Sequence, residues 1–229
     1  MRKQFFTLSA IIILGLSLSA CETPANMAKD SMAKKEGKPV NITGSMMAVT
    51  FTADGASHTI SRNQDNAAVV DEKFVKTSRP CPPFCIQPAV LAPGVETIAE
   101  LEVLDYIKSM HSGNPVIVQD SRTPDWHARG HIPGTVSIPW TSLATKAGAT
   151  IIDISEIMVD QFGVKEVEGI FDFKEAKTLV LYCNGMWCGQ SPASIKTLLS
   201  FGYPAHKIKW YRGGMQSWSN LGLTATAAQ

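Results

Sequence analysis

Short apolar runs alternate with segments of helical periodicity from residue 95 to the end of the chain. Continuous apolar runs are typical of strands buried on both faces, and they predict strands at residues 115–119, 135–138, 178–182 and 207–211. Helical spacing of apolar residues predicts helices at 98–110, 154–162, 191–201 and 215–221, the first preceded by the capping-box pair Thr97 and Glu100. Strands alternating with helices predict an α/β fold, a mainly parallel sheet with helices on both faces.

Residues 46–94 have a different pattern and are expected to form an N-terminal extension. Strand-like residues 47–52 and 57–60 flank the turn signal Asp54-Gly55, which predicts a β-hairpin. Five prolines between residues 79 and 94 exclude helix and strand, so this part is expected to be an extended, Pro-rich connector. The α/β domain would then occupy residues 95–229.

Residues 1–20 have the pattern of a secretory signal peptide. Basic residues precede an apolar run at residues 5–18, which is too short and wrongly flanked for a membrane span. The ending Leu-Ser-Ala-Cys resembles the bacterial lipobox and predicts lipidation of Cys21; an ordinary cleaved signal is the alternative. Glu22 resembles the outer-membrane sorting pattern. We therefore expect an outer-membrane lipoprotein on the periplasmic side of a bacterial membrane.

Residues 21–45 are rich in lysine, alanine, glycine, serine and asparagine and show no apolar period, so we expect a flexible tether. A helix at residues 25–35 is the alternative, although it would lack an apolar face. The chain has 21 basic and 20 acidic residues, and loss of residues 1–20 leaves 19 basic against 20 acidic. This balance predicts no nucleic-acid partner. Contact with a membrane is expected from the lipid anchor at Cys21.

Four cysteines remain after Cys21. Exported compartments are oxidising, so we expect the local pairs Cys81–Cys85 and Cys183–Cys188, with free thiols as the alternative. The spacing of Cys81 and Cys85 does not match the Cys-x-x-Cys redox pattern, and no further ligands complete a zinc site. A disulfide that stiffens the connector is the preferred interpretation, and neither a metal site nor a cofactor is expected.

Cys183 is the candidate nucleophile. It follows the strand predicted at residues 178–182, and a glycine-containing loop leads from it to the helix opened by Ser191. In parallel sheets, ligands bind beyond the carboxyl ends of the strands. Backbone amides and the helix dipole favour an anion at such a position, so the pKa of the thiol should be lowered. A buried structural cysteine is the alternative.

Four motifs lie in order between residues 95 and 224. They are Asp120-Ser121-Arg122, Gly130-His131-Ile132-Pro133-Gly134 followed by Ile138-Pro139, Tyr182-Cys183 opening a loop to Ser191, and Gly202-Tyr203 with Tyr211-Arg212-Gly213-Gly214-Met215 and Trp218. Together they resemble the rhodanese family of sulfurtransferases. The resemblance implies one rhodanese-like domain, without the second copy of the tandem form, and sulfur transfer through a persulfide on Cys183.

The expected substrate is a small sulfur-containing anion or a thiol. The resemblance implies that Cys183 takes the outer sulfur of a donor such as thiosulfate and passes it to a thiophilic acceptor. The substrate-binding loop would comprise Asn184, Gly185, Met186, Trp187, Cys188, Gly189, Gln190 and Ser191. Unlike the common family loop, it contains no arginine or lysine. Backbone amides alone would hold the anion, or an arginine from elsewhere would assist: Arg122, Arg129 or Arg212.

Cys188 has three alternative roles: it resolves the persulfide by pairing with Cys183, protects that sulfur from overoxidation, or packs as a small apolar residue. His131 could act as a general base, but a structural role is preferred because a thiolate of low pKa needs none.

Two other functions compete with sulfur transfer. The protein could be a thiol–disulfide redox protein that cycles Cys183 and Cys188, or a non-catalytic module that binds an envelope partner through residues 46–94. A cysteine phosphatase is disfavoured, since its loop ends in an arginine that grips phosphate and residues 184–191 contain none.

Overall fold

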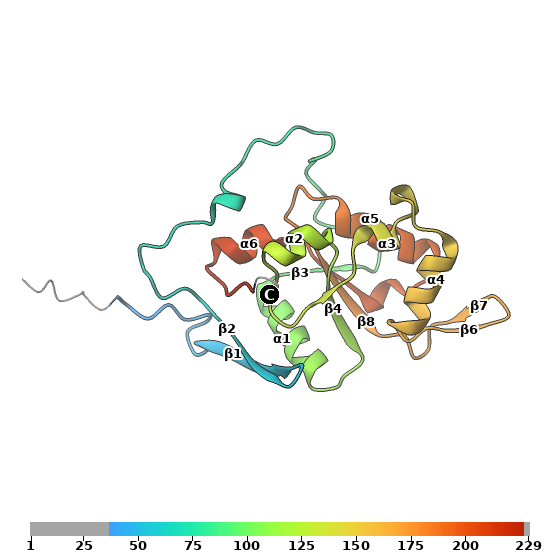
Figure 1. The fold of residues 1–229 in the computed structure, drawn as a ribbon, viewed down its shortest axis with the longest axis horizontal. Coiled ribbons are helices and arrows are strands. Elements are labelled where there is room, and N and C mark those ends of the chain that lie inside the picture. Colours follow the sequence, from blue (N-terminus) through green and yellow to red (C-terminus); the bar gives the residue numbers. More distant parts are fainter. Residues whose placement is uncertain (1–36, 227–229) are drawn as a thin grey trace, which may run out of the picture. The chain divides into compact units, whose positions relative to one another are not determined.

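The computed structural model describes residues 37–226, so the predicted signal peptide, Cys21 and most of the predicted tether lie outside the described residues. The strands are β1 (Ala48–Ala53), β2 (Ala56–Ser61), β3 (Glu96–Ile98), β4 (Val116–Asp120), β5 (Val136–Ser137), β6 (Lys165–Val167), β7 (Ile170–Asp172), β8 (Thr178–Tyr182) and β9 (Ile208–Tyr211). The helices are α1 (Glu100–His111), α2 (Pro124–Arg129), α3 (Trp140–Leu143), α4 (Ile151–Asp160), α5 (Gln190–Ser200) and α6 (Gly214–Asn220) (Figure 1).

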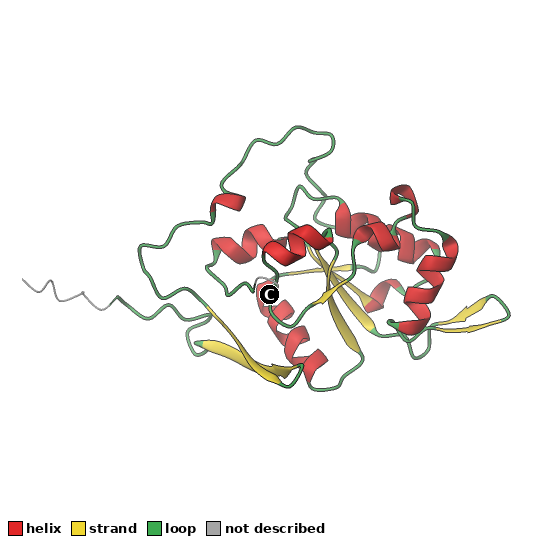
Figure 2. Cartoon of the chain, viewed as in Figure 1, coloured by secondary structure: helices red, strands yellow, loops and turns green. Residues whose placement is uncertain are grey.

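The central sheet has five parallel strands in the order β3-β9-β8-β4-β5. Strand β8 lies in the middle, paired with β4 on one side and with β9 on the other, and helices surround the sheet (Figure 2). The α/β class expected from the alternating pattern is therefore confirmed. Parallel strands end at the same edge of the sheet, so the segment after β8 emerges between the ends of its two neighbours.

Both faces of the sheet are buried, which explains the continuous apolar runs. On one face, Val118 and Val180 pack with α1, α6 and the β1–β2 hairpin. On the other, Leu179 and Leu181 pack with α3, α4 and α5. Each fully buried aliphatic side chain contributes about 1.5–3 kcal/mol of transfer free energy. Strand β8 therefore contributes to both cores and is held rigidly where its last residue meets the loop.

The predicted hairpin is confirmed and belongs to the core of the domain. Strands β1 and β2 pair antiparallel around Asp54 and Gly55, both with positive φ, as the preferred tight hairpin turn requires. The Phe51 ring stacks on His111 at the end of α1, with 4.7 Å between ring centres. Ile60 is fully buried in the same cluster as Val180. The extension thus covers one face of the sheet.

The end of the predicted tether contacts this hairpin region. Gln64 holds Val40 by two hydrogen bonds, accepting from its amide at 3.0 Å and donating to its carbonyl at 2.9 Å. Ile42 packs against the buried cluster that contains the hairpin.

Within residues 37–226, no helix is long and apolar enough to cross a membrane.

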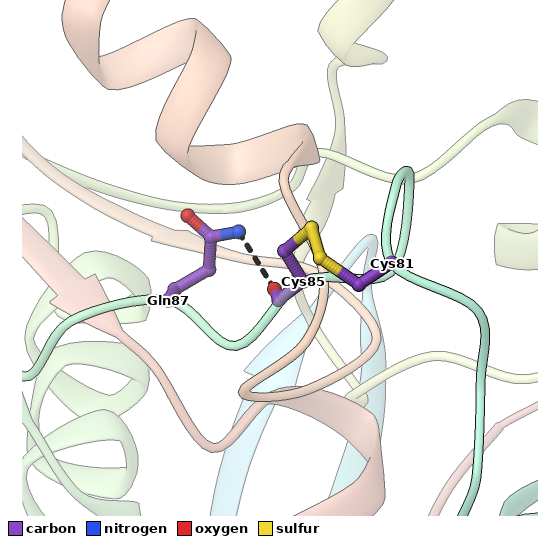
Figure 3. The surroundings of a disulfide bond; sticks show 3 residues. All are labelled: Cys81, Cys85 and Gln87. Carbon is purple, nitrogen blue, oxygen red and sulfur yellow. Dashed lines mark hydrogen bonds between the residues drawn. A yellow bond between two sulfur atoms is a disulfide. The ribbon is translucent and has the colours of Figure 1, made fainter.

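The Pro-rich connector runs through residues 79–94 without helix or strand, as its prolines predict. The structure links Cys81 and Cys85 by a disulfide, and the Gln87 side chain donates to the Cys85 carbonyl at 2.9 Å (Figure 3). The cross-link and this hydrogen bond stabilise the local path of a segment that has no ladder hydrogen bonds of its own.

The predicted start of the first helix was wrong. Thr97 and Ile98 belong to strand β3, which pairs with β9, and α1 begins at Glu100. The predicted capping pair does not form. Instead, the Glu102 carboxylate accepts from the Ala99 amide at 3.0 Å, while Glu100 accepts from the Tyr211 hydroxyl. Pairing with an edge of the sheet satisfies more backbone groups than another helical turn would.

The sequence pattern also missed four short elements. Strands β6 and β7 form a hairpin around Glu168 and Gly169, both at positive φ. Helices α2 and α3 span six and four residues, too few for a period to be recognised. The remaining strands and helices lie within a few residues of their predicted positions.

Candidate active site

Cys183 directly follows β8 and faces the start of α5, the position expected from the sequence. Its side chain is 3% exposed. The Ser191 hydroxyl donates to the Cys183 Sγ at 3.1 Å, and the Trp210 indole donates to the Ser191 Oγ at 3.2 Å. The indole nitrogen occupies one side of the serine oxygen, so the hydroxyl proton is directed toward the sulfur.

These contacts decide the charge of Cys183. Burial raises the pKa of the thiol, but hydrogen bonds from Cys188, the Ser191 hydroxyl and the backbone of Ser191 and Gly185 outweigh it. The pKa is lowered to about 7. The loop is therefore built to stabilise a thiolate, and a large fraction of the sulfur is ionised at neutral pH.

Cys188 lies beside Cys183, but its pKa is shifted in the opposite direction. Burial, and then the neighbouring Cys183, raise the pKa of Cys188 well above its ordinary value. One thiol is thus a proton donor to the other, which is the thiolate. Both cysteines are free, so the expected pair Cys183–Cys188 is absent from this structure. A close thiol and thiolate are nevertheless the two groups that a disulfide would require.

Helix α6 holds the loop from the other side. The Met215 and Gln216 amides donate to the Cys183 and Asn184 carbonyls at 3.0 and 2.9 Å. Gly214 has φ +55°, and a Cβ at this position would collide with the Cys183 carbonyl and the Gly185 amide nitrogen. A glycine is therefore required for α6 to approach the loop this closely.

Two of the three arginines considered for assisting an anion, Arg122 and Arg212, are bonded to other groups. Arg122 is 1% exposed; its Nη2 donates to the Asp120 carboxylate and to the Gly130 carbonyl, each at 2.6 Å. Burial raises the pKa of Asp120, but hydrogen bonds from His127 and Arg122 outweigh this effect, so the pKa of Asp120 is lowered. Arg212 donates to the Gln87 carbonyl at 2.8 Å and so fastens the connector.

His131 belongs to the same polar cluster as Asp120. Its ring stacks on His127 at 3.9 Å between centres, and its Nδ1 is 3.1 Å from the His127 carbonyl. Burial, followed by the charge of His127, lowers the pKa of His131. Arg129, the third arginine considered, pairs with Asp125 at the surface.

The connector supplies a cation that the loop lacks. The Arg79 guanidinium carbon lies 4.1 Å from the centre of the Trp187 ring and 5.5 Å from that of Phe84. Phe84 packs edge to face on Trp187, and the Gln87 amide donates to the Met186 carbonyl at 2.8 Å. The Pro-rich connector therefore lies directly against the candidate substrate-binding loop.

A pocket of about 400 Å³ opens between the connector and the loop. It is lined by Arg79, Pro83, Phe84, Trp126, Trp140, Asn184, Trp187, Cys188, Gly189 and Gln190. Five of the eight predicted substrate-binding residues are in this lining. Of the other three, Gly185 is buried against α6, Ser191 is bonded to the Cys183 sulfur, and Met186 is exposed. In the described part of the chain, no three His, Cys, Asp or Glu side chains gather as a metal site would need.

Residues 103–221 match the family model of the rhodanese-like domain. This match covers more than half of the chain and includes most of α1, Cys183 and α6. The chain belongs to the rhodanese-like family. No curated protein matches it in sequence.

Solved structures similar to this rhodanese-like domain come from several organisms. The BH2092 protein of Bacillus halodurans has 18% identity, a TM-score of 0.40, and coverage of 58% of this chain and 77% of that one. A rhodanese-related protein of Thermoplasma volcanium has 19% identity, a TM-score of 0.32, and coverage of 57% and 97%. The thiosulfate sulfurtransferase of Pseudomonas aeruginosa has 20% identity, a TM-score of 0.38, and coverage of 59% and 21%.

Sequence reasoning located the loop of the rhodanese-like domain but not what covers it. Arg79 and Phe84 precede the family match, and nothing in their spacing indicates contact with Trp187. Trp126 and Trp140 lie on the short helices α2 and α3, which the pattern did not reveal.

Proposed function

We propose that this rhodanese-like protein is a sulfurtransferase that carries sulfane sulfur as a persulfide on Cys183. The observation that carries the proposal is the hydrogen-bonded Cys183 thiol, whose pKa is lowered to about 7 at the junction of β8 and α5. A thiolate at neutral pH is the nucleophile that substitution at sulfur requires. The family membership supports the same chemistry.

The first half-reaction would load the enzyme. The Cys183 thiolate attacks the outer sulfur of thiosulfate, a new S–S bond forms, and the S–S bond of the donor breaks with its electron pair leaving on sulfite. In the second half-reaction, a thiophilic acceptor such as cyanide or a thiolate attacks the outer sulfur of the persulfide. The electron pair of the breaking bond returns to Cys183 and restores the thiolate. No external oxidant or reductant is needed.

Groups around the loop would stabilise the charge in both half-reactions. The Ser191 hydroxyl and the backbone of Ser191 and Gly185 act on the sulfur itself, because they already lower the pKa of Cys183. The amino end of α5 adds its dipole. These donors are fixed by Trp210 and α6 before substrate arrives, so little reorganisation accompanies the reaction.

A thiol–disulfide function is the second candidate, and the contact between the two free cysteines favours it. In that case Cys188 would attack a mixed disulfide or a persulfide on Cys183, and an oxidised Cys183–Cys188 pair would result. The sulfur leaving the persulfide would be released as sulfide.

Turnover of thiosulfate and cyanide to thiocyanate and sulfite distinguishes the two functions. We expect activity in the full chain, complete loss in Cys183→Ser, and retention of at least half of kcat in Cys188→Ser. If Cys188→Ser loses as much activity as Cys183→Ser, the redox pair becomes the better account. If thiocyanate forms equally with Cys183→Ser, sulfur transfer through this residue is excluded.

We further infer an exported, lipid-anchored location. The signal pattern of residues 1–20 and the lipobox-like ending at Cys21 support it. The Cys81–Cys85 disulfide adds support, because disulfides persist in oxidising compartments. Labelling of cells with a clickable fatty acid, comparing the wild type with Cys21→Ala, tests this location: label on the variant would contradict it.

A further inference from the structure

The pocket between the connector and the loop that follows Cys183 is walled by aromatic rings. Phe84 and Trp187 come from the connector and the loop, and Trp126 and Trp140 come from α2 and α3. Its volume of about 400 Å³ lies in the range of sites for small organic ligands, roughly 300–1,000 Å³. A small inorganic anion such as thiosulfate would leave most of this space, and all of its apolar surface, without a partner.

Three polar atoms of the residues that line this pocket have no hydrogen-bond partner in the described part of the chain. The Asn184 Oδ1, the Trp140 Nε1 and the Arg79 Nε are buried and have no hydrogen-bond partner among the described residues. The Asn184 side chain is 95% buried, as its exposed fraction is 5%. Buried polar groups normally have partners, since desolvation without one costs about 1–3 kcal/mol. The three residues that carry these atoms all line one pocket, and this grouping points to a ligand with polar groups of its own.

Arg79 supplies the positive charge of the pocket. Its guanidinium carbon lies over the Trp187 ring and near Phe84, and its Nε has no hydrogen-bond partner among the described residues. A planar guanidinium binds a carboxylate by two parallel hydrogen bonds. The disulfide between Cys81 and Cys85 and the Arg212–Gln87 contact hold the connector in this position.

We propose that this pocket is a subsite for an organic thiol that carries a flat apolar group and a carboxylate or similar anion, with Arg79 binding the anion. The inference rests on the proposed function, because such a thiol would be the sulfur acceptor. Its thiolate bonds to the outer sulfur of the Cys183 persulfide, and the bond from that sulfur to Cys183 breaks with its electron pair returning to Cys183. The product is an organic persulfide.

Binding is measured first, without any sulfur chemistry. Full-length Cys183→Ser is titrated with 4-nitrobenzoate, which cannot accept sulfur and quenches tryptophan fluorescence. We expect saturable quenching, a dissociation constant about tenfold weaker after Arg79→Met, and partial recovery with Arg79→Lys, which keeps the charge but not the planar fork. The neutral analogue 4-nitrobenzamide should bind with the same affinity before and after Arg79→Met.

Acceptor use is measured next. Wild-type protein loaded with sulfur on Cys183 is discharged by 4-mercaptobenzoate, 4-mercaptophenol or cyanide. Arg79→Met should lower kcat/KM for 4-mercaptobenzoate about tenfold more than for 4-mercaptophenol. Lys196→Met, which removes an exposed cation of α5 that does not line this pocket, is the matched control and should not change this ratio.

The outcomes separate the two proposals. If 4-nitrobenzoate binds through Arg79 but no persulfide ever forms, the subsite stands and sulfur transfer fails. If the persulfide forms but Arg79→Met changes neither the affinity for 4-nitrobenzoate nor the acceptor ratio, the subsite is overturned and sulfur transfer stands. An equal effect of Arg79→Met and Lys196→Met would also overturn it, since it would reflect general charge only.

Discussion

Two side chains, Trp210 and Ser191, form a hydrogen-bonded chain that ends at the Cys183 sulfur. Trp210 donates to the Ser191 oxygen, and Ser191 donates to Cys183. These two hydrogen bonds connect strand β9, which carries Trp210, to the nucleophile. Because the Ser191 oxygen accepts from Trp210, its proton is directed to the Cys183 sulfur. Because a hydroxyl stabilises the thiolate more than the thiol, its loss should be visible in the ionisation of the cysteine.

The first prediction concerns the pH dependence of Cys183. Its thiolate should react with iodoacetamide at a rate that rises with pH around a midpoint of about 7. Ser191→Ala removes a donor to the anion, so the pKa must rise and the midpoint must move upward, toward or beyond the ~8.5 of an ordinary thiol. Mass spectrometry of the alkylated peptide at a series of pH values measures both.

Ser194→Ala is the matched control for this prediction. Ser194 is buried on the same helix, but its hydroxyl donates to the Gln190 carbonyl and not to the sulfur. Its removal should leave the midpoint where it is. A midpoint that fails to rise in Ser191→Ala, or that rises equally in both variants, would show that the hydroxyl of Ser191 does not stabilise the thiolate.

At this scale the sequence revealed the nucleophile but not its surroundings. Cys183 could be found because a strand end and a helix start bracket it along the chain. The roles of Trp210 and Arg79 depend on packing between segments that are far apart in the sequence. No local sequence pattern predicts such packing. Arg122 and Arg212 were reasonable candidates by charge, but a buried carboxylate and a connector carbonyl bind them.

At the scale of elements, the loop is held between α6 and the connector. Helix α6 binds the loop carbonyls, while the connector binds Met186 and stacks on Trp187. The approach of α6 depends on Gly214, because any larger residue would meet the loop backbone. The geometry of the active-site loop therefore depends on the close contact between the backbone of α6 and the backbone of the loop.

The second prediction is that Gly214→Ala destabilises the protein and disturbs the loop. The substitution combines an unfavourable positive φ with a collision against the Cys183 carbonyl, so we expect a loss of about 2–4 kcal/mol in the free energy of unfolding. Urea denaturation measures this loss, and the alkylation rate of Cys183 should change in the same variant.

Gly113→Ala isolates the collision from the backbone conformation. Gly113 also has positive φ, at +84°, but its Cβ would meet open space. The control should lose about 1–2 kcal/mol and leave the alkylation rate of Cys183 unchanged. Equal losses for the two variants would mean that close approach to the loop contributes nothing at Gly214.

The elements that the sequence revealed are those long enough to show a period or bounded by clear turn residues. Strand β8 and helix α5 are of this kind. Ile98 was assigned to the first helix, and Thr97 to its cap, because the apolar period of α1 extends back to Ile98. Residues 96–98 instead pair with β9, a long-range contact that a local pattern does not contain. The β6–β7 hairpin was missed because its strands are three residues long and largely exposed.

At the scale of the whole domain, residues 46–94 are part of one folded unit. The hairpin buries Ile60 and Phe51 in the cluster that contains Val180 of the central sheet, and the connector covers the loop. The rhodanese-like match begins only at residue 103, yet the site extends beyond it. The extension therefore contributes to stability through the hairpin and to the site through the connector.

The third prediction tests whether the hairpin and the central sheet unfold together. Ile60→Ala should lower the free energy of unfolding by about 2–5 kcal/mol, because it leaves a cavity in a shared core. Circular dichroism and tryptophan fluorescence should report the same single urea transition. Thr50→Ala, on the exposed side of the same hairpin, should change stability by no more than about 0.5 kcal/mol. Two separate transitions would show instead that the hairpin folds independently of the sheet.

The central claim is that Cys183 carries sulfur, and the intact mass of the protein after incubation with thiosulfate tests it most directly. We predict a gain of one sulfur atom that is removed by cyanide, absent in Cys183→Ser and still present in Cys188→Ser. A protein whose mass does not change, or that gains the same sulfur when Cys183 is replaced, would contradict the account.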